Sequence, residues 1–144
     1  MALDKAKTLL LSEGHTCVLF GAKGYYTSKR RGVAPLVRFL QQGQIPPCCL
    51  AADKVVGKAT AYLYILLKIQ ALYAQVISKP ALAVLTAYGI CVEYETLVEN
   101  IINRAGDGIC PFEEAVMDIS HPQTAYDAIL RKIAAMNISL EETI

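Results

Sequence analysis

The sequence lacks an excess of charge of either sign. Its 14 lysine and arginine residues face 13 acidic residues, which leaves a formal net charge of +1. The longest basic run is Lys29-Arg30-Arg31. Proteins that bind nucleic acid or an acidic membrane surface carry clustered positive charge. We therefore expect neither nucleic acid nor a membrane as a partner.

Long hydrophobic runs are also missing. The longest mostly apolar stretch, from Val55 to Leu67, is too short for a membrane-spanning helix, which needs about 20 residues. The stretch from Met1 to Lys7 has neither the apolar core nor the cleavage site of a signal peptide. We expect a cytoplasmic protein, in which the five cysteines are reduced thiols.

Several chemical signatures are absent as well. The chain has no phosphate-binding loop, dinucleotide fingerprint or nucleophile elbow. Its two histidines, His15 and His121, are too far apart in sequence to suggest a metal site. We therefore expect no cofactor and no bound metal.

The composition is that of a folded protein. Hydrophobic residues make up 54% of the chain and charged residues 19%, which argues against disorder. A length of 144 residues suits one domain with a sizeable core, and neither a repeat nor a linker divides it. We expect a single domain over residues 1–144, with a frayed tail at 137–144.

Strand and helix patterns alternate along the chain, which is typical of the α/β class. Alternation over residues 48–94 implies βαβ crossovers and a partly parallel sheet. A hairpin at 16–27 adds an antiparallel part, so the sequence predicts a three-layer α/β/α fold with a mixed sheet and extra C-terminal helices. The predicted helices cover 3–11, 33–42, 55–67, 79–89, part of 95–103, 111–119 and 124–136; the predicted strands cover 16–20, 25–27, 48–52, 71–78 and 90–94.

The apolar stretch from Val55 to Leu67 has no polar face, which predicts a helix buried on all sides. Asp53 is placed to cap its N-terminus, and Lys54 and Lys58 would then lie one turn apart. Lysines in a first helical turn oppose the helix dipole. They either bind an anionic ligand, with Arg104 as a further cation, or extend into solvent. We include Asp53, Lys54 and Lys58 among the candidate ligand-binding residues.

Two further groups of polar residues follow the last predicted strand. Asn103 and Arg104 precede a glycine-bearing loop, and Glu113 and Glu114 follow it. The guanidinium of Arg104 suits a carboxylate or a phosphate, or else it pairs with one of the two glutamates. We include Asn103, Arg104 and Glu113 among the candidate ligand-binding residues.

Cys110 is the candidate nucleophile. Pro111 suits the first position of a helix, which places Cys110 at its N-cap, where the helix dipole favours a thiolate. Glycines 106 and 108 permit turns that could direct backbone N–H groups at an anion. Against this role, Glu113 and Glu114 oppose thiolate formation, and no general base is adjacent in sequence. The alternative is a partly buried structural cysteine.

The order of helix, hairpin, central helix, strand, proline-started helix and strand resembles the cytidine deaminase-like fold. That resemblance implies a zinc-ligand His or Cys before the central helix and a Pro-Cys-x-x-Cys motif at the next one. Here the motif reads Pro80-Ala81-Leu-Ala-Val84, without either thiolate. Before the central helix, where the resemblance implies His or Cys, only Asp53 could contribute a ligand, and zinc requires several. We therefore expect the fold without its zinc site.

The stretches 52–59 and 102–116 are similar to a small prokaryotic family of unknown function that has this fold and lacks the zinc site. Our first hypothesis is a small-ligand-binding or regulatory module, with a small anion bound where zinc would lie. The alternative is a hydrolase or transferase that uses Cys110 as its nucleophile. A third possibility is an interaction protein that forms an oligomer.

Overall fold

The computed structural model describes residues 2–12, 14–21, 24–29, 33–42, 48–103 and 105–138. Its centre is a five-stranded mixed sheet in the order β2-β1-β3-β4-β5. The strands are β1 (Cys17–Gly21), β2 (Gly24–Ser28), β3 (Cys48–Val56), β4 (Ala71–Ser78) and β5 (Cys91–Val98). β1 is antiparallel to β2 and β3, whereas β3, β4 and β5 are parallel. The predicted α/β class with a mixed sheet is confirmed.

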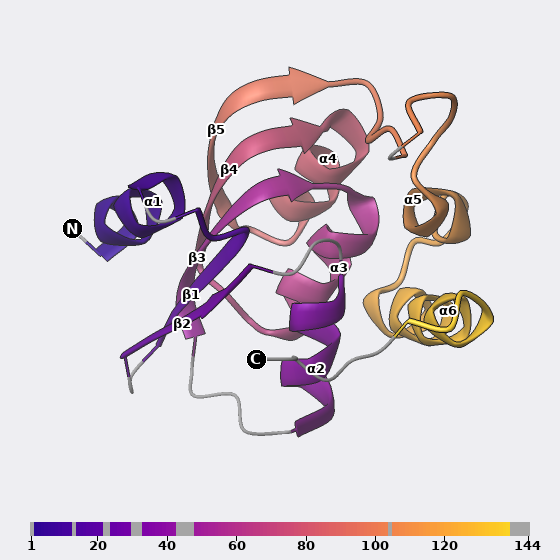
Figure 1. Cartoon of the computed structure of the whole chain (residues 1–144), viewed down its shortest axis with the longest axis horizontal. Helices are drawn as coiled ribbons and strands as arrows, with labels where there is room; N and C mark the ends of the chain where they lie inside the picture. The colour runs from indigo at the N-terminus through magenta and orange to yellow at the C-terminus, as the bar shows by residue number, and fades with distance from the viewer. Residues whose placement is uncertain are drawn as a thin grey trace.

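Helices cover both faces of the sheet (Figure 1). One face carries α1, and the other carries α2, α3 and α4, with α5 and α6 packed beyond α3. The helices are α1 (Ala2–Ser12), α2 (Ala34–Gln42), α3 (Lys58–Leu66), α4 (Lys79–Ala87), α5 (Pro111–Ala115) and α6 (Pro122–Ala135).

The core has two parts, one on each side of the sheet. On the smaller side, Leu10 of α1 packs with Val18, Ala52 and Tyr73 of the strands. The larger part lies around α3, where every residue from Ala59 to Tyr64 is buried. The prediction of a central helix buried on all sides is confirmed for these residues, while Ile65 and Leu66 are partly buried.

The start of α3 differs from the prediction. The sequence placed Asp53 at its N-cap, but Asp53 lies within β3, and Gly57 is the N-cap. The reason is the pair Val55-Val56, which continues the strand by pairing with Val76 and Ile77 of β4. Branched side chains suit such a ladder, so helical geometry begins only at Lys58.

The region after residue 94 also differs. The sequence allowed a helix over 95–103, but β5 continues to Val98 because it pairs with β4 as far as Ser78. The helix predicted over 111–119 is shorter and ends at Ala115. At the C-terminal end, the Ile138 N–H donates to Ile133 O at 3.1 Å, and the rest of the tail expected to fray lies outside the described residues.

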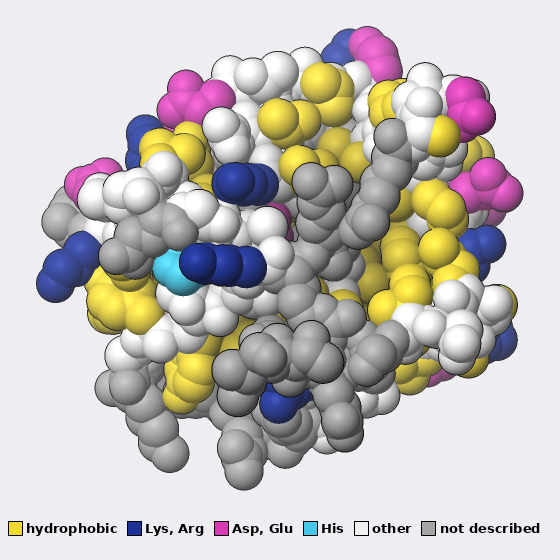
Figure 2. All heavy atoms as spheres, viewed as in Figure 1, with side chains coloured by type: hydrophobic (Ala, Val, Ile, Leu, Met, Phe, Trp, Pro, Cys, Tyr) yellow, Lys and Arg dark blue, Asp and Glu magenta, His cyan; other side chains and the backbone are white. Residues whose placement is uncertain are grey.

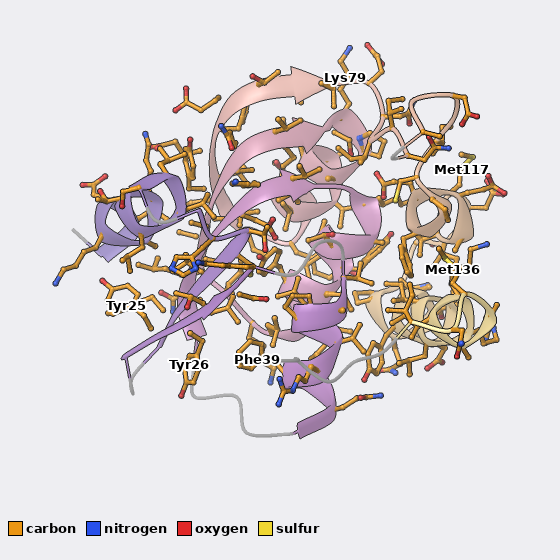
Figure 3. The ribbon with its side chains drawn as sticks, in the orientation of Figure 1. Tyr25, Tyr26, Phe39, Lys79, Met117 and Met136 are labelled. Carbon is orange, nitrogen blue, oxygen red and sulfur yellow. The ribbon has the colours of Figure 1, made fainter. Side chains whose placement is uncertain are left out.

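Side-chain contacts tie the outer elements together. The rings of Tyr26 in β2 and Phe39 in α2 meet edge to face with centroids 5.4 Å apart (Figure 3).

Figure 2 shows that hydrophobic side chains gather on the surface formed by α5 and α6. Met117 and Met136 are exposed there by 48% and 44%, so this surface combines apolar character with accessibility.

Candidate functional site

The N-termini of α3 and α4 lie at one edge of the sheet. β3 leads into α3 through Gly57, and β4 leads into α4 through Ser78. Because the two strands are parallel neighbours, their carboxyl ends meet at this edge, which is where open α/β sheets bind ligands. Two helix N-termini also bring partial positive charge there. We call Gly57, Ala59, Ser78 and Glu113 the helix-start site.

Glu113 of α5 places its carboxylate in the helix-start site. Its Oε2 accepts a hydrogen bond from the Ala59 N–H at 3.1 Å, and its Oε1 accepts from the Ser78 hydroxyl at 3.3 Å. The residue is only 7% exposed. The place at which the sequence predicted a bound anion is therefore taken by the chain's own carboxylate.

Ser78 joins this carboxylate to the second helix. Its Oγ accepts a hydrogen bond from the Ala81 N–H at 3.3 Å and so caps α4. The same hydroxyl donates to Glu113. Since α4 begins with Lys79 and Pro80, Ser78 stands at the position where serine is preferred as an N-cap.

Gly57 is the residue that admits the carboxylate. A Cβ atom at this position would lie 2.5 Å from Oε1 and 2.7 Å from Oε2 of Glu113. The backbone of Gly57 is extended, with φ −98° and ψ −179°, a conformation that any residue adopts. The glycine is therefore required by space and not by backbone conformation.

The segment that carries Glu113 is fastened to α3 at two more points. Lys58 Nζ donates to the Met117 carbonyl at 2.9 Å, and the Tyr62 hydroxyl donates to the Ile119 carbonyl at 2.8 Å. Lys58 also lies 5.9 Å from the centre of the Tyr62 ring. Lys58, the first residue of α3, is thus directed toward the chain following α5.

Asp53 and Lys54 do not join this site. The Asp53 carboxylate accepts from the Tyr64 hydroxyl at 2.7 Å and from the Val55 N–H at 3.2 Å. Lys54 lies half-buried on the strand, so it does not share a helical turn with Lys58. The prediction that Asp53 caps α3 and that Lys54 and Lys58 lie one turn apart was wrong, because β3 extends through Asp53 and Lys54. A role of these three residues in ligand binding stays a prediction.

Asn103 organises its own loop. Its Oδ1 accepts from the N–H groups of Gly106 at 2.9 Å and Asp107 at 3.3 Å, and its amide donates to Asp107 Oδ1 at 3.0 Å. These bonds engage the side chain that we had considered for ligand binding. Arg104, the other candidate of this stretch, lies outside the described residues.

Cys110 occupies the predicted N-cap of α5, with Pro111 as the first helical residue. Its side chain is partly buried and packs against the larger core. In the part of the chain that the structure describes, no side chain forms a hydrogen bond with its Sγ. With only five residues in α5, the geometry favours the structural interpretation of this cysteine.

Alkylation rates are expected to follow exposure. Cys91 is exposed, Cys110 is partly buried and Cys17 is buried, so Cys91 should react faster than Cys110, with Cys17 slowest. Timed iodoacetamide labelling followed by peptide mass spectrometry measures the order. Faster reaction at Cys110 than at Cys91 would instead indicate an activated thiolate and favour the nucleophile hypothesis.

Four residues with clear side-chain or backbone contacts were not among the site residues that the sequence predicted. Ser78 had a local signal, because serine before Lys79-Pro80 is a helix-start pattern. In the sequence, the only signal at Gly57 was its small size. Cys17 and Tyr64, which contact each other at 3.3 Å between Sγ and Oη, had no local signal, because 47 residues separate them.

Two features have no counterpart among the described residues, namely a metal-binding cluster and a membrane-spanning helix. No group of three or more His, Cys, Asp or Glu side chains there is arranged to hold a metal ion. In the same residues, no helix has the length and apolar character needed to cross a membrane.

Comparison with known proteins gave one family and one solved structure of note. The model of a family described as TM1506, a domain of unknown function (DUF1893), matches residues 5–133. The crystal structure of a DUF1893 family protein (TM1506) from Thermotoga maritima is similar, with a TM-score of 0.82 and 27% sequence identity. The similarity covers 90% of this chain and 88% of that one. None of the curated proteins compared with the chain matches it.

Proposed function

The chain belongs to this DUF1893 family, and we propose that it is a small-ligand-binding or regulatory module on a zinc-free cytidine deaminase-like fold. Residues 1–144 form one domain in this proposal. Support comes from the order of elements and from Pro80 at the start of α4. Ala81, which is buried, and Val84, which packs against the larger core, stand where the resemblance implies zinc-binding thiolates.

The observation that carries the ligand proposal is the carboxylate of Glu113 at the helix-start site. A donor set formed by the Ala59 N–H and the Ser78 hydroxyl already holds one anion, at two helix N-termini that favour negative charge. A small molecule bearing a carboxylate or a phosphate satisfies the same donors. In this proposal such a ligand takes the place of Glu113, and displacement of α5 is the regulatory output.

Both helices at the site begin with lysine. Lys58 and Lys79 are the first residues of α3 and α4, where positive charge opposes the helix dipole. Lys58 reaches the Met117 carbonyl, and Lys79 pairs with Glu99 at 2.5 Å. Their presence around two helix starts supports an anionic ligand, because they add long-range attraction for it.

The alternative of a cysteine-dependent hydrolase or transferase has less support. A nucleophilic thiol needs a nearby base or a clearly positive environment. Cys110 is followed in its own short helix by Glu113 and Glu114, and the Glu113 carboxylate points to the starts of α3 and α4. We therefore prefer ligand binding at the helix-start site to catalysis by Cys110.

The test is chemical rescue of the variant Glu113→Ala. Removal of the carboxylate leaves the Ala59 and Ser78 donors empty beside Gly57, so formate should bind there and raise the thermal midpoint of the variant. Chloride at equal ionic strength and neutral formamide should give little change. If the variant is unfolded in chloride, recovery of its circular dichroism spectrum in formate gives the same result.

Glu114→Ala is the matched control, because Glu114 is exposed and adjacent in the same helix. Formate should leave its midpoint and that of the unmodified protein unchanged. Equal effects of formate and chloride on Glu113→Ala would contradict an anion site at these helix starts. Thermal-shift screening of the unmodified protein with carboxylates and nucleotides then searches for the natural ligand.

A further inference from the structure

A second buried polar cluster lies away from the helix-start site. Cys17 of β1 and Asp53 of β3 are directly opposite each other in the antiparallel ladder. Tyr64 of α3 lies over this pair, with its hydroxyl 2.7 Å from Asp53 Oδ2 and 3.3 Å from Cys17 Sγ. The three side chains form one chain of hydrogen bonds that joins two strands to the central helix.

The cluster is closed off from solvent. Tyr64 has no exposed surface, and Cys17 and Asp53 are 5% and 8% exposed. An ionised carboxylate in such a place needs a counter-charge or several hydrogen bonds. Among the described residues, no lysine or arginine forms a salt bridge with Asp53.

Few of the described groups face Asp53. The titratable ones among them are Cys17 from β1 and Tyr64 from α3, while the residue paired with Asp53 on β4 is Ala74. On β3 itself, the backbone N–H of Lys54 favours the ionised carboxylate of Asp53, and the same N–H donates to the Thr16 carbonyl oxygen at 3.0 Å. The described side chains that form hydrogen bonds around Asp53 in this cluster are thus uncharged donors and acceptors.

We propose that Cys17, Tyr64 and Asp53 form a proton switch in which the hydrogen bonds reverse when Asp53 gains or loses a proton. With Asp53 ionised, Tyr64 donates to the carboxylate and the Cys17 thiol donates to the Tyr64 oxygen. With Asp53 protonated, its O–H donates to Tyr64, and the Tyr64 hydroxyl donates to Cys17 sulfur. Either atom of the Cys17–Tyr64 contact can be the donor. The exchanged proton comes from water and returns to it.

The switch operates near neutral pH. Burial raises the pKa of Asp53 from 3.8 to about 7, against the opposing effects of the Tyr64 and Val55 hydrogen bonds. Burial also raises the pKa of Tyr64 well above its usual value, so Tyr64 keeps its proton throughout. Because the pKa of Asp53 is higher in the folded state than in the unfolded state, folding takes up a proton between about pH 4 and pH 7.

Linkage gives the direction of the pH effect. The stability that protonated Asp53 provides is fully present below its unfolded pKa and is lost as pH rises through its folded pKa. Within that range, the folding equilibrium constant falls by about tenfold per pH unit from this one group. Ionisation at higher pH therefore lowers the stability of the fold, because the charged carboxylate is buried. This inference does not depend on the proposed ligand at the helix-start site.

Urea unfolding across pH 5 to 8 tests the proposal by comparing the full chain with Asp53→Asn. Up to about pH 7, the folding equilibrium constant of the unmodified protein should fall with rising pH, and Asp53→Asn should lack about tenfold per pH unit of that fall. Asp118→Asn, at an exposed position, is the matched control and should keep the unmodified slope. Equal slopes for Asp53→Asn and the unmodified protein would overturn the proposal.

Infrared difference spectroscopy follows the switch directly and does not require Asp53→Asn to fold. The carbonyl stretch of a buried carboxylic acid should be present at pH 5 and disappear with a midpoint near pH 7. In Tyr64→Phe the midpoint should move to higher pH, because the lost hydrogen bond favours the ionised carboxylate. An unchanged or lower midpoint in Tyr64→Phe, or no acid band at pH 5, would contradict the switch.

Discussion

Alanine in place of Gly57 is expected to lower the free energy of unfolding by about 2–4 kcal/mol, through overpacking and lost hydrogen bonds. The added Cβ would lie 2.5 Å and 2.7 Å from the Glu113 carboxylate oxygens, so Glu113 must leave the Ala59 N–H and the Ser78 hydroxyl. Backbone strain does not contribute, because Gly57 is extended. Urea unfolding followed by circular dichroism measures the loss.

Gly108→Ala is the matched control for this substitution. Among the described residues, a Cβ at Gly108 would meet only the Asn103 amide nitrogen at 3.5 Å, which is ordinary contact, and we expect a change within about 0.5 kcal/mol. If Gly57→Ala were as mild as Gly108→Ala, the close approach of Glu113 to the start of α3 would be wrong.

The double variant Gly57→Ala, Glu113→Ala sharpens the interpretation. Once the carboxylate is absent, the added methyl group has space, so the two costs should not add. We expect the double variant to be more stable than the sum of the single effects predicts, by at least about 1 kcal/mol, as is usual for residues in contact. Additive costs would show that Gly57 responds to something other than the carboxylate.

The second large effect is expected for Glu113→Ala, which should lower the free energy of unfolding by about 3 kcal/mol because it leaves two buried donors unpaired. The affected donors are the Ala59 N–H and the Ser78 hydroxyl. The hydrogen bonds that join α5 to the starts of α3 and α4 are lost with the carboxylate. Urea unfolding in chloride buffer, without formate, gives the value.

Two variants serve as comparisons for that loss. Glu113→Gln keeps the shape of the side chain and one carbonyl acceptor, so its cost should be smaller. Glu114→Ala removes an exposed carboxylate from the same turn, and we expect a change within about 0.5 kcal/mol. Similar stabilities for the Glu113→Ala and Glu114→Ala variants would contradict a structural role for the buried carboxylate.

Local patterns predicted most of the secondary structure. β4 was predicted with its observed bounds, Ala71–Ser78, because turn residues and helix-start residues flank an apolar run. Pro80 predicted the start of α4, and Pro111 predicted that Cys110 stands at the start of α5, because proline is favoured in a first helical turn. In each case the determining interactions lie within a few residues of one another.

Strand lengths were harder to predict where a neighbouring strand decides them. Nothing local separates a helix from a strand over residues 95–98, or determines whether Val55 and Val56 end a strand or begin a helix. Pairing with β4 settles both, because backbone groups at these positions find partners in the ladder. The error at Val55 also misplaced Asp53 and Lys54.

The sequence by itself thus determined the α/β class, the buried central helix and the helix starts that proline and serine mark. Only the tertiary structure decided which groups meet at those starts. Glu113 reaches Ala59 across 54 residues and Ser78 across 35, and Tyr64 reaches Asp53 across 11. Such contacts arise when strand pairing and helix packing bring distant segments together, and no spacing along the chain records them.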